Sequence, residues 1–329
     1  MSGSLIAVAR TPWAPRHTAL DGRRPEVLLA AALADVTRRA DIDAGAIDRI
    51  LVACDTSVGA QDLNVGRRAA VEAGWNRTPA LTVDGHGVTG LALVGLAAGL
   101  PGLTVVAGVD ASSMVPPGAG LVRDYGRPTL EQPEHRWLES VASSADLSAA
   151  ALDRAVEAAQ AGVTLTNPSI VELTGGPAAD TAVDQERGDP FEPEGMVAPH
   201  HLAPWADGAV AVLIAPSGGR AIATATLEAL DDDEIITHLV DASAGLPRIV
   251  VDNNAVVASL AASGSDIVAS PLAIGSAPSC DGLRALADAA ATLDEGFEIR
   301  TRGGHGQVAT VTIGSGDRLT DISKPLDAT

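Results

Sequence analysis

Apolar residues along the chain alternate between strand-like runs and helical spacing. In the first part this pattern predicts strands over 5–11, 46–57, 80–84 and 103–110, and helices over 24–42, 64–75 and 90–100. Strands that alternate with helices are typical of a sheet with helices packed on its faces. The first part of the chain therefore predicts an α/β fold with a mainly parallel or mixed sheet.

The same order of elements returns later in the chain. The pattern predicts strands over 207–216, 220–230 and 265–275, helices over 233–243 and 281–293, a strand running into a helix over 248–260, and two strands joined by a glycine turn over 297–314. This repetition predicts an internal duplication of α/β halves. We expect an N-terminal half of 1–115 plus 200–216, and a C-terminal half of 217–329.

Residues 116–199 interrupt the pattern. They are rich in turn-forming and acidic residues, and they hold one well-marked helix within 143–162, with Ser148 as its expected N-cap. Loops that leave a sheet in this way commonly cover a binding site. We therefore predict a loop excursion over 116–199.

Composition narrows the class of protein. The formal net charge of −20 argues against a nucleic-acid partner, which needs a basic face. Only 2% of residues are aromatic, so small aliphatic residues must fill the core. The two cysteines, Cys54 and Cys280, are too few for a disulfide framework or a cysteine-rich metal site, and they fit a reducing cytoplasm.

No membrane or export segment is expected. The N-terminal stretch lacks the basic region and long apolar run of a signal peptide. The most apolar window, 90–109, is long enough to span a membrane, but Pro101 and Gly102 divide it. We interpret it as a buried helix followed by a buried strand, and we expect a cytoplasmic protein.

The stretch TVDGHGVTGLALV at 82–94 predicts a strand end, a glycine turn and a buried helix. Enzymes place nucleophiles at such an elbow because the amino end of the helix stabilises negative charge. Here the elbow consists of Gly85, His86, Gly87 and Val88, and none of these residues is a standard nucleophile. The expected architecture is therefore present without the expected chemistry.

Eight segments resemble, in order, motifs of the thiolase family. They are ARTPW (9–13), NVGR (64–67), TVDGHGVTGLALV (82–94), VVAGVDASSM (105–114), WADGAVAVLIAP (205–216), NNAV (253–256), GSAPSCDGLRAL (275–286) and RGGHGQVATVTI (302–313). Each match is weak alone, but their order covers nearly the whole chain. The resemblance implies a duplicated thiolase-like fold, layered α-β-α-β-α, with a shortened excursion. It is not evidence of activity, because fold does not fix function.

The catalytic residues that the resemblance implies are replaced. The nucleophilic cysteine falls on Gly87, and the histidine of the family's Gly-His-Pro motif falls on Ser276, or on Ser270 if the alignment slides. The second cysteine falls near Arg300. The family's asparagine is kept as Asn253, but the acidic residue after it becomes Asn254.

Several other side chains could contribute to a pocket. His86 sits at the elbow, and Gly303, Gly304 and His305 form the turn that the resemblance places near it. These glycines do not form a phosphate loop, since strands rather than a helix flank them. Cys54 and Cys280 are expected to pack in the core.

The adjacent His200 and His201 could indicate a metal ion, but no acidic residue has a supporting spacing, so no metal is expected.

Two functions remain open. The first is a thiolase-like protein without acyl-transfer activity, which binds an acyl-CoA or serves as a non-catalytic subunit. The second is an acyltransferase or retro-aldol enzyme that acts on CoA thioesters through other residues, such as Ser276, His305 or Asn253. No covalently bound cofactor is expected, a CoA thioester is the possible ligand, and the resemblance implies a homodimer or a heteromer with a related subunit.

Overall fold

The structure, a computed structural model, describes residues 3–116, 119, 134–240, 246–252, 254–262, 267–268, 271–304 and 306–319. Its strands form one continuous path of hydrogen-bonded neighbours, β4-β3-β5-β6-β1-β7-β11-β10-β8-β9, with the short β2 (Ala14–Pro15) paired to β6. The path divides into two halves that meet where β1 and β7 pair over only two positions.

The first half holds β1 (Ser4–Arg10), β3 (Arg49–Ala53), β4 (Ala80–Val83), β5 (Thr104–Ala111) and β6 (Ala206–Ala215). The second holds β7 (Arg220–Ala229), β8 (Arg248–Val251), β9 (Ile267–Val268), β10 (Phe297–Arg302) and β11 (Gln307–Ile313). In each half the third strand along the chain lies at the outer edge, and the first strand faces the other half. The parallel and antiparallel pairings also agree strand for strand, so the duplicated topology is confirmed. The residue boundaries predicted for the halves remain a prediction.

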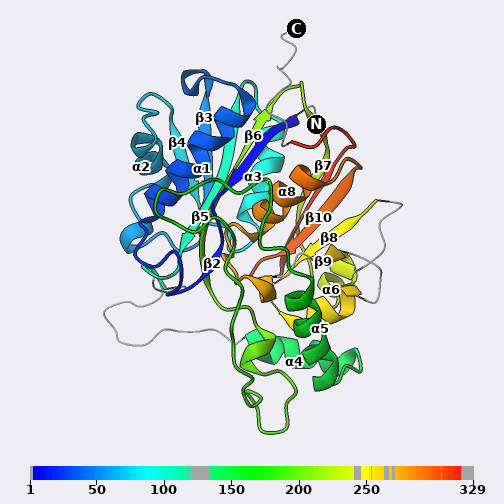
Figure 1. Ribbon diagram of the computed structural model, residues 1–329. Helices are drawn as coiled ribbons and strands as arrows, with labels where there is room; N and C mark the ends of the chain where they lie inside the picture. The colour runs from blue at the N-terminus through cyan, green and yellow to red at the C-terminus, as the bar shows by residue number, and fades with distance from the viewer. Residues whose placement is uncertain are drawn as a thin grey trace.

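Five layers build the molecule (Figure 1). Helices α1 (Pro25–Ala40) and α2 (Val65–Glu72) cover the outer face of the first half-sheet. Helices α3 (Thr89–Ala98) and α8 (Asp281–Thr292) lie between the two half-sheets, and α6 (Asp232–Val240) and α7 (Ala255–Ala262) lie on the outside of the second. The layering α-β-α-β-α that the resemblance implied is therefore observed.

The two central helices are held close by a reciprocal exchange of side chains. A Cβ atom at Gly90 of α3 would lie 2.6 Å from Leu283 Cγ, and one at Gly282 of α8 would lie 2.8 Å from Leu91 Cγ. Each helix therefore receives the other's leucine at a position that only glycine leaves open. This contact gives a packing reason for glycine in both motifs.

The excursion is more ordered than predicted. The expected helix is α5 (Ala149–Gly162), and Ser148 caps it by accepting a hydrogen bond from the Ala151 N–H at 3.3 Å. A second helix, α4 (Glu134–Ser144), was not predicted. Buried residues from the excursion and α7 form a shared core: Leu138, Leu152, Val156, Val197 and Val256. This core attaches the excursion to the second half.

One strand expectation was wrong in extent. The segment 265–275 was expected to be strand-like. Of its described residues, 267–268 and 271–275, the structure assigns Ile267–Val268 to a strand and Pro271–Ala273 to a short 3₁₀ helix. The apolar window 90–109 forms α3 followed by β5, as expected. Within the described residues, no helix combines the length and apolarity needed to cross a membrane.

Candidate functional site

The elbow between β4 and α3 has the backbone that its glycines predict. His86 and Gly87 both have positive φ, at +51° and +89°. A Cβ atom at Gly87 would lie 3.1 Å from Gly303 Cα and 3.3 Å from the Arg302 carbonyl oxygen. The position therefore disfavours any side chain, both because of its backbone angle and because the facing backbone is close.

The glycine turn after β10 packs directly against the elbow. The Gly304 N–H donates hydrogen bonds to the His86 carbonyl oxygen at 3.0 Å and to His86 Nδ1 at 3.1 Å. A Cβ atom at Gly303 would lie 2.2 Å from the His86 carbonyl oxygen. The structure thus brings four of the candidate residues, His86, Gly87, Gly303 and Gly304, into direct contact. His305, Asn253 and Ser270 lie outside the described residues.

Asp55, which sequence reasoning missed, occupies the amino end of the elbow helix. Its Oδ2 accepts a hydrogen bond from the Gly87 N–H at 2.5 Å, and its Oδ1 accepts one from Thr89 Oγ1 at 2.8 Å. Thr89 Oγ1 in turn accepts from the Gly85 N–H at 2.8 Å. Burial raises the pKa of Asp55, against the lowering effect of these hydrogen bonds.

A pattern in the sequence points to Asp55. It follows β3 and Asp84 follows β4, and these strands are parallel neighbours, so both carboxylates lie at the same sheet edge as the elbow.

Ser276 is committed to a structural network. Its Oγ donates to Asp281 Oδ2 at 2.6 Å, and the Ala277 N–H donates to the other carboxylate oxygen at 3.1 Å. Its backbone pairs with the segment before β6, through the Pro204 carbonyl and the Ala206 N–H, each at 2.7 Å. A buried hydroxyl that already donates to a carboxylate is poorly suited to act as a base.

Arg300 points away from the central layer. Side chains alternate along β10, and the neighbouring Thr301 packs toward Gly282 of α8. The Arg300 guanidinium instead pairs with Glu298 at 2.6 Å and donates to the His238 carbonyl oxygen on α6. The arginine at the position implied for the second cysteine therefore lies on the outer face of the second half-sheet.

Both cysteines are buried, as predicted. Burial raises the pKa of Cys54 to about 12, and the nearby charge of Asp110 adds to the effect. Burial also raises the pKa of Cys280 well above its ordinary value. A protonated, enclosed thiol is a poor nucleophile, so both cysteines are poorly suited to nucleophilic chemistry.

Asp110 is a further buried acid next to this region. Its Oδ2 accepts hydrogen bonds from Ser279 Oγ at 2.6 Å and from the Ser279 N–H at 3.2 Å. Burial and the charge of Asp55 raise its pKa well above the ordinary value. The surroundings of the elbow are therefore acidic.

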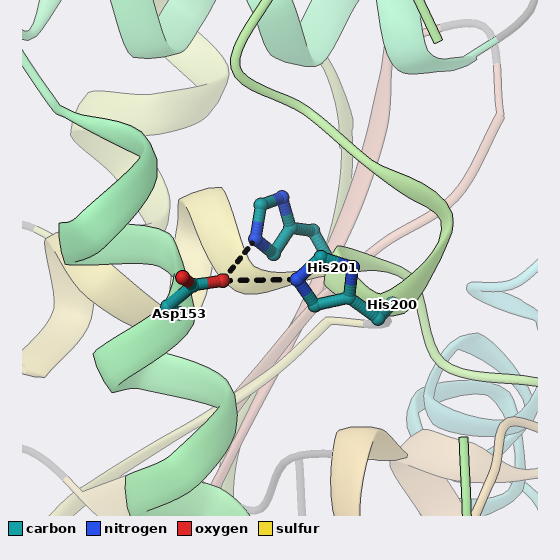
Figure 2. A group of neighbouring side chains, drawn as sticks. All are labelled: Asp153, His200 and His201. Atoms are coloured by element: carbon teal, nitrogen blue, oxygen red, sulfur yellow. Dashed lines mark hydrogen bonds and ion pairs between the residues drawn. The ribbon is translucent and has the colours of Figure 1, made fainter. Parts of the chain in front are cut away.

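His200 and His201 meet an acidic partner that sequence spacing did not reveal. Asp153 on α5 accepts from both rings, as Figure 2 shows. These two hydrogen bonds lower the pKa of Asp153, whereas burial lowers that of His201. The fold joins residues that lie 47 and 48 positions apart.

Solved structures share this arrangement of elements. Human mitochondrial 3-ketoacyl-CoA thiolase in complex with CoA superposes with a TM-score of 0.78, over 96% of this chain and 98% of that chain, at 16% sequence identity. The chain has a thiolase-like fold. A second structure of the human thiolase gives a TM-score of 0.76 at 16% identity, over 95% of this chain and 98% of that one.

A bacterial structure gives the same result. The acetyl-CoA acetyltransferase of Bacillus anthracis superposes with a TM-score of 0.73 at 17% identity, over 95% of this chain and 98% of that chain. No protein-family model matches the sequence, and no curated protein matches it. At such low identity the likeness establishes the thiolase-like fold alone.

Proposed function

We propose that this protein is a thiolase-like scaffold without thiolase acyl-transfer activity. It binds an acyl-CoA or a partner protein, in the manner of a non-catalytic subunit. The observation that carries the proposal is Gly87, which stands at the implied nucleophile position with φ of +89° and faces the Gly303 backbone. No acyl-enzyme can form at a residue that has no side chain.

The electrostatics of the elbow support the same conclusion. Acyl transfer needs a thiolate and a stabilised oxyanion, and both gain from the positive amino end of a helix. Here the Asp55 carboxylate already accepts the Gly87 N–H and the Thr89 hydroxyl. A carboxylate at this place repels additional negative charge, whereas thiolase chemistry requires attraction.

CoA is the ligand class to test, because one structure with this fold was solved in complex with CoA. Titration calorimetry with CoA, acetyl-CoA and a short 3-ketoacyl-CoA measures binding, and a thiolysis assay on the same preparation measures turnover. We expect no turnover above the uncatalysed rate. Thiolysis that persists after Cys54→Ser and Cys280→Ser are combined would overturn the proposal.

A second candidate is an enzyme that cleaves or transfers CoA thioesters without an acyl-enzyme. Asp55 favours it, because a half-buried carboxylate whose pKa is raised, beside the elbow, has the properties of a general base. The test is retro-aldol cleavage of a 3-hydroxyacyl-CoA. Activity that Asp55→Asn abolishes and Asp84→Asn leaves intact would select this candidate over the first.

Assembly through the first half-sheet is part of the proposal. Strand β4 lies at the edge of the sheet, and Leu81 on it is 57% exposed. An edge strand with an exposed apolar residue can pair with another chain. We propose a cytoplasmic homodimer, or a heteromer with a related subunit, joined at β4.

A further inference from the structure

Three potential metal ligands converge where α5 of the excursion meets the segment just after it, on elements distinct from the elbow. Asp153 Oδ1 lies 2.9 Å from His200 Nε2 and 3.0 Å from His201 Nε2. The three ligand atoms all lie within 4.8 Å of one another. Figure 2 shows both imidazole rings directed at the same oxygen of the Asp153 carboxylate. Asp153 lies on α5, and the two histidines lie on the segment that faces it.

The cluster is enclosed on one side and open on the other. The side chain of His201 is 2% exposed and that of His200 is 10% exposed, whereas that of Asp153 is 27% exposed. Two fixed nitrogen ligands with a more accessible carboxylate leave room for water to complete a coordination shell. Such an open position distinguishes a three-ligand site from a closed structural one.

The remaining oxygen of Asp153 is held by a second layer of contacts. Arg187 Nη1 lies 3.2 Å from Asp153 Oδ2, and Arg187 Nη2 lies 2.5 Å from Glu157 Oε1. This arrangement orients the carboxylate and leaves Oδ1 directed at the histidines. Partners that orient a ligating carboxylate are typical of metal sites.

The positions of the ring protons on His200 and His201 limit the affinity of this cluster for a metal ion. The Ala198 N–H donates to His201 Nδ1 at 3.0 Å, and the Gly188 N–H donates to His200 Nδ1 at 3.3 Å. Each ring proton therefore lies on Nε2, where it is donated to Asp153. A metal on Nε2 requires the proton to move to Nδ1, so both backbone hydrogen bonds must open. The site is consequently weaker than a preformed one.

We propose that Asp153, His200 and His201 bind a divalent transition-metal ion, with Zn²⁺ as the best match. Two imidazole nitrogens and one carboxylate oxygen suit zinc and its transition-metal neighbours, whereas Mg²⁺ and Ca²⁺ prefer oxygen ligands. In a tetrahedral zinc site the ligand atoms are roughly 3.3 Å apart. Asp153 Oδ1 lies 2.9 and 3.0 Å from the two imidazole nitrogens, so each of these two distances must lengthen by only a few tenths of an ångström.

The location gives the ion a structural consequence. Leu202, next to His201, forms a bridge to Asn254, and Trp205 forms one to Ser276. A metal would therefore fasten α5 to the segment that leads to both of these positions. We expect zinc to stabilise the excursion and to leave the elbow itself unchanged.

Titration calorimetry with Zn²⁺ on chelator-treated full-length protein tests the proposal. We expect one ion per chain with a dissociation constant in the micromolar range. His201→Ala and the nearly isosteric Asp153→Asn should each weaken binding at least tenfold. His17→Ala is the matched control, because His17 faces Asp21 in an exposed histidine–aspartate pair that has no third ligand among the residues the structure describes.

A second readout separates metal binding from a structural role. If zinc moves the ring protons, hydrogen exchange at the Ala198 and Gly188 amides should accelerate on addition of Zn²⁺. Absence of binding at 100-fold excess over a micromolar constant, or binding that Asp153→Asn leaves unchanged while circular dichroism shows it folded, would overturn the proposal. The cluster would then be a hydrogen-bonded clamp. Neither result bears on acyl transfer at the elbow.

Discussion

Replacing Gly87 with cysteine restores the side chain of the implied nucleophile, and the structure predicts that it does not restore the reaction. A residue with a Cβ atom at φ of +89° costs about 1–2 kcal/mol in backbone energy. Its Cβ atom also lies 3.1 Å from Gly303 Cα, and relief of this contact requires a backbone shift that costs about 1–3 kcal/mol. We expect Gly87→Cys to destabilise the protein by about 2–5 kcal/mol.

Two other glycine variants separate the backbone cost from the cost of the steric contact. Gly74 has φ of +81° and no atom within 4 Å of an added Cβ, so Gly74→Ala carries only the backbone cost of about 1–2 kcal/mol. Gly162, at the end of α5, has neither a positive φ nor a close neighbour, so Gly162→Ala should change stability by less than about 1 kcal/mol. Urea unfolding followed by circular dichroism measures all three.

The chemical half of the prediction uses the same variant. With the Asp55 carboxylate at the elbow, a thiol at position 87 should stay protonated at neutral pH. We expect slow alkylation by iodoacetamide and no thiolysis of 3-ketoacyl-CoA. A Gly87→Cys protein that is as stable as Gly162→Ala would refute the steric argument. Rapid alkylation and turnover would refute the electrostatic one.

Three further predictions concern the core, pH and assembly. Arg10 is buried and makes two hydrogen bonds to Asp180, at 2.7 and 2.8 Å, and one to Asp288 at 2.6 Å. Since Asp288 still compensates the charge, Asp180→Asn should cost about 1.5–3 kcal/mol, whereas Asp294→Asn in an exposed ion pair should cost less than about 1 kcal/mol. Burial raises the pKa of Asp110, so this residue should lower the free energy of unfolding progressively as the pH rises above 3.8, the ordinary pKa of an aspartate. Asp110→Asn should remove that decline in urea midpoints, and an unchanged pH profile would contradict it. Leu81→Lys should convert a dimer to a monomer in light scattering, and an unchanged mass would place the interface elsewhere.

Hydrophobic periodicity predicted the alternation of strands and helices well, whereas the layering was implied by the resemblance to the thiolase family. The uniformly apolar helix at 90–100 indicated a buried helix, and α3 does lie between two half-sheets, although Leu96 on it is exposed. The repeated order of strands and helices indicated the duplication. Prediction failed at 271–275, where a short apolar run without clear period fits a strand or an irregular buried segment equally well.

The candidate site was predictable only in part. The features that depend on the backbone were predicted from the sequence, since the glycines at 87, 303 and 304 indicated turns, and these turns are in close contact. Asp55 and Asp153 were missed because their partners are distant in sequence, and only the tertiary fold brings them together. No periodic pattern marks a carboxylate that caps a helix of another segment. Such residues can be predicted from which strands are neighbours in the sheet, but not from their spacing along the sequence.

Both central helices have the chain's own carboxylates at their amino ends. Asp55 accepts from the Gly87 N–H before α3, whereas at α8 Asp110 accepts from the Ser279 N–H and Asp281 from the Ala277 N–H. Such N–H groups can stabilise a thiolate or an oxyanion, but in this structure they donate to carboxylates. The carboxylates and a thiolate nucleophile exclude each other, because like charges at hydrogen-bond distance in a buried site are costly. Glycine at position 87 and aspartate at position 55 are therefore consistent with each other under the proposed function, because neither leaves a place for a thiolate at the elbow.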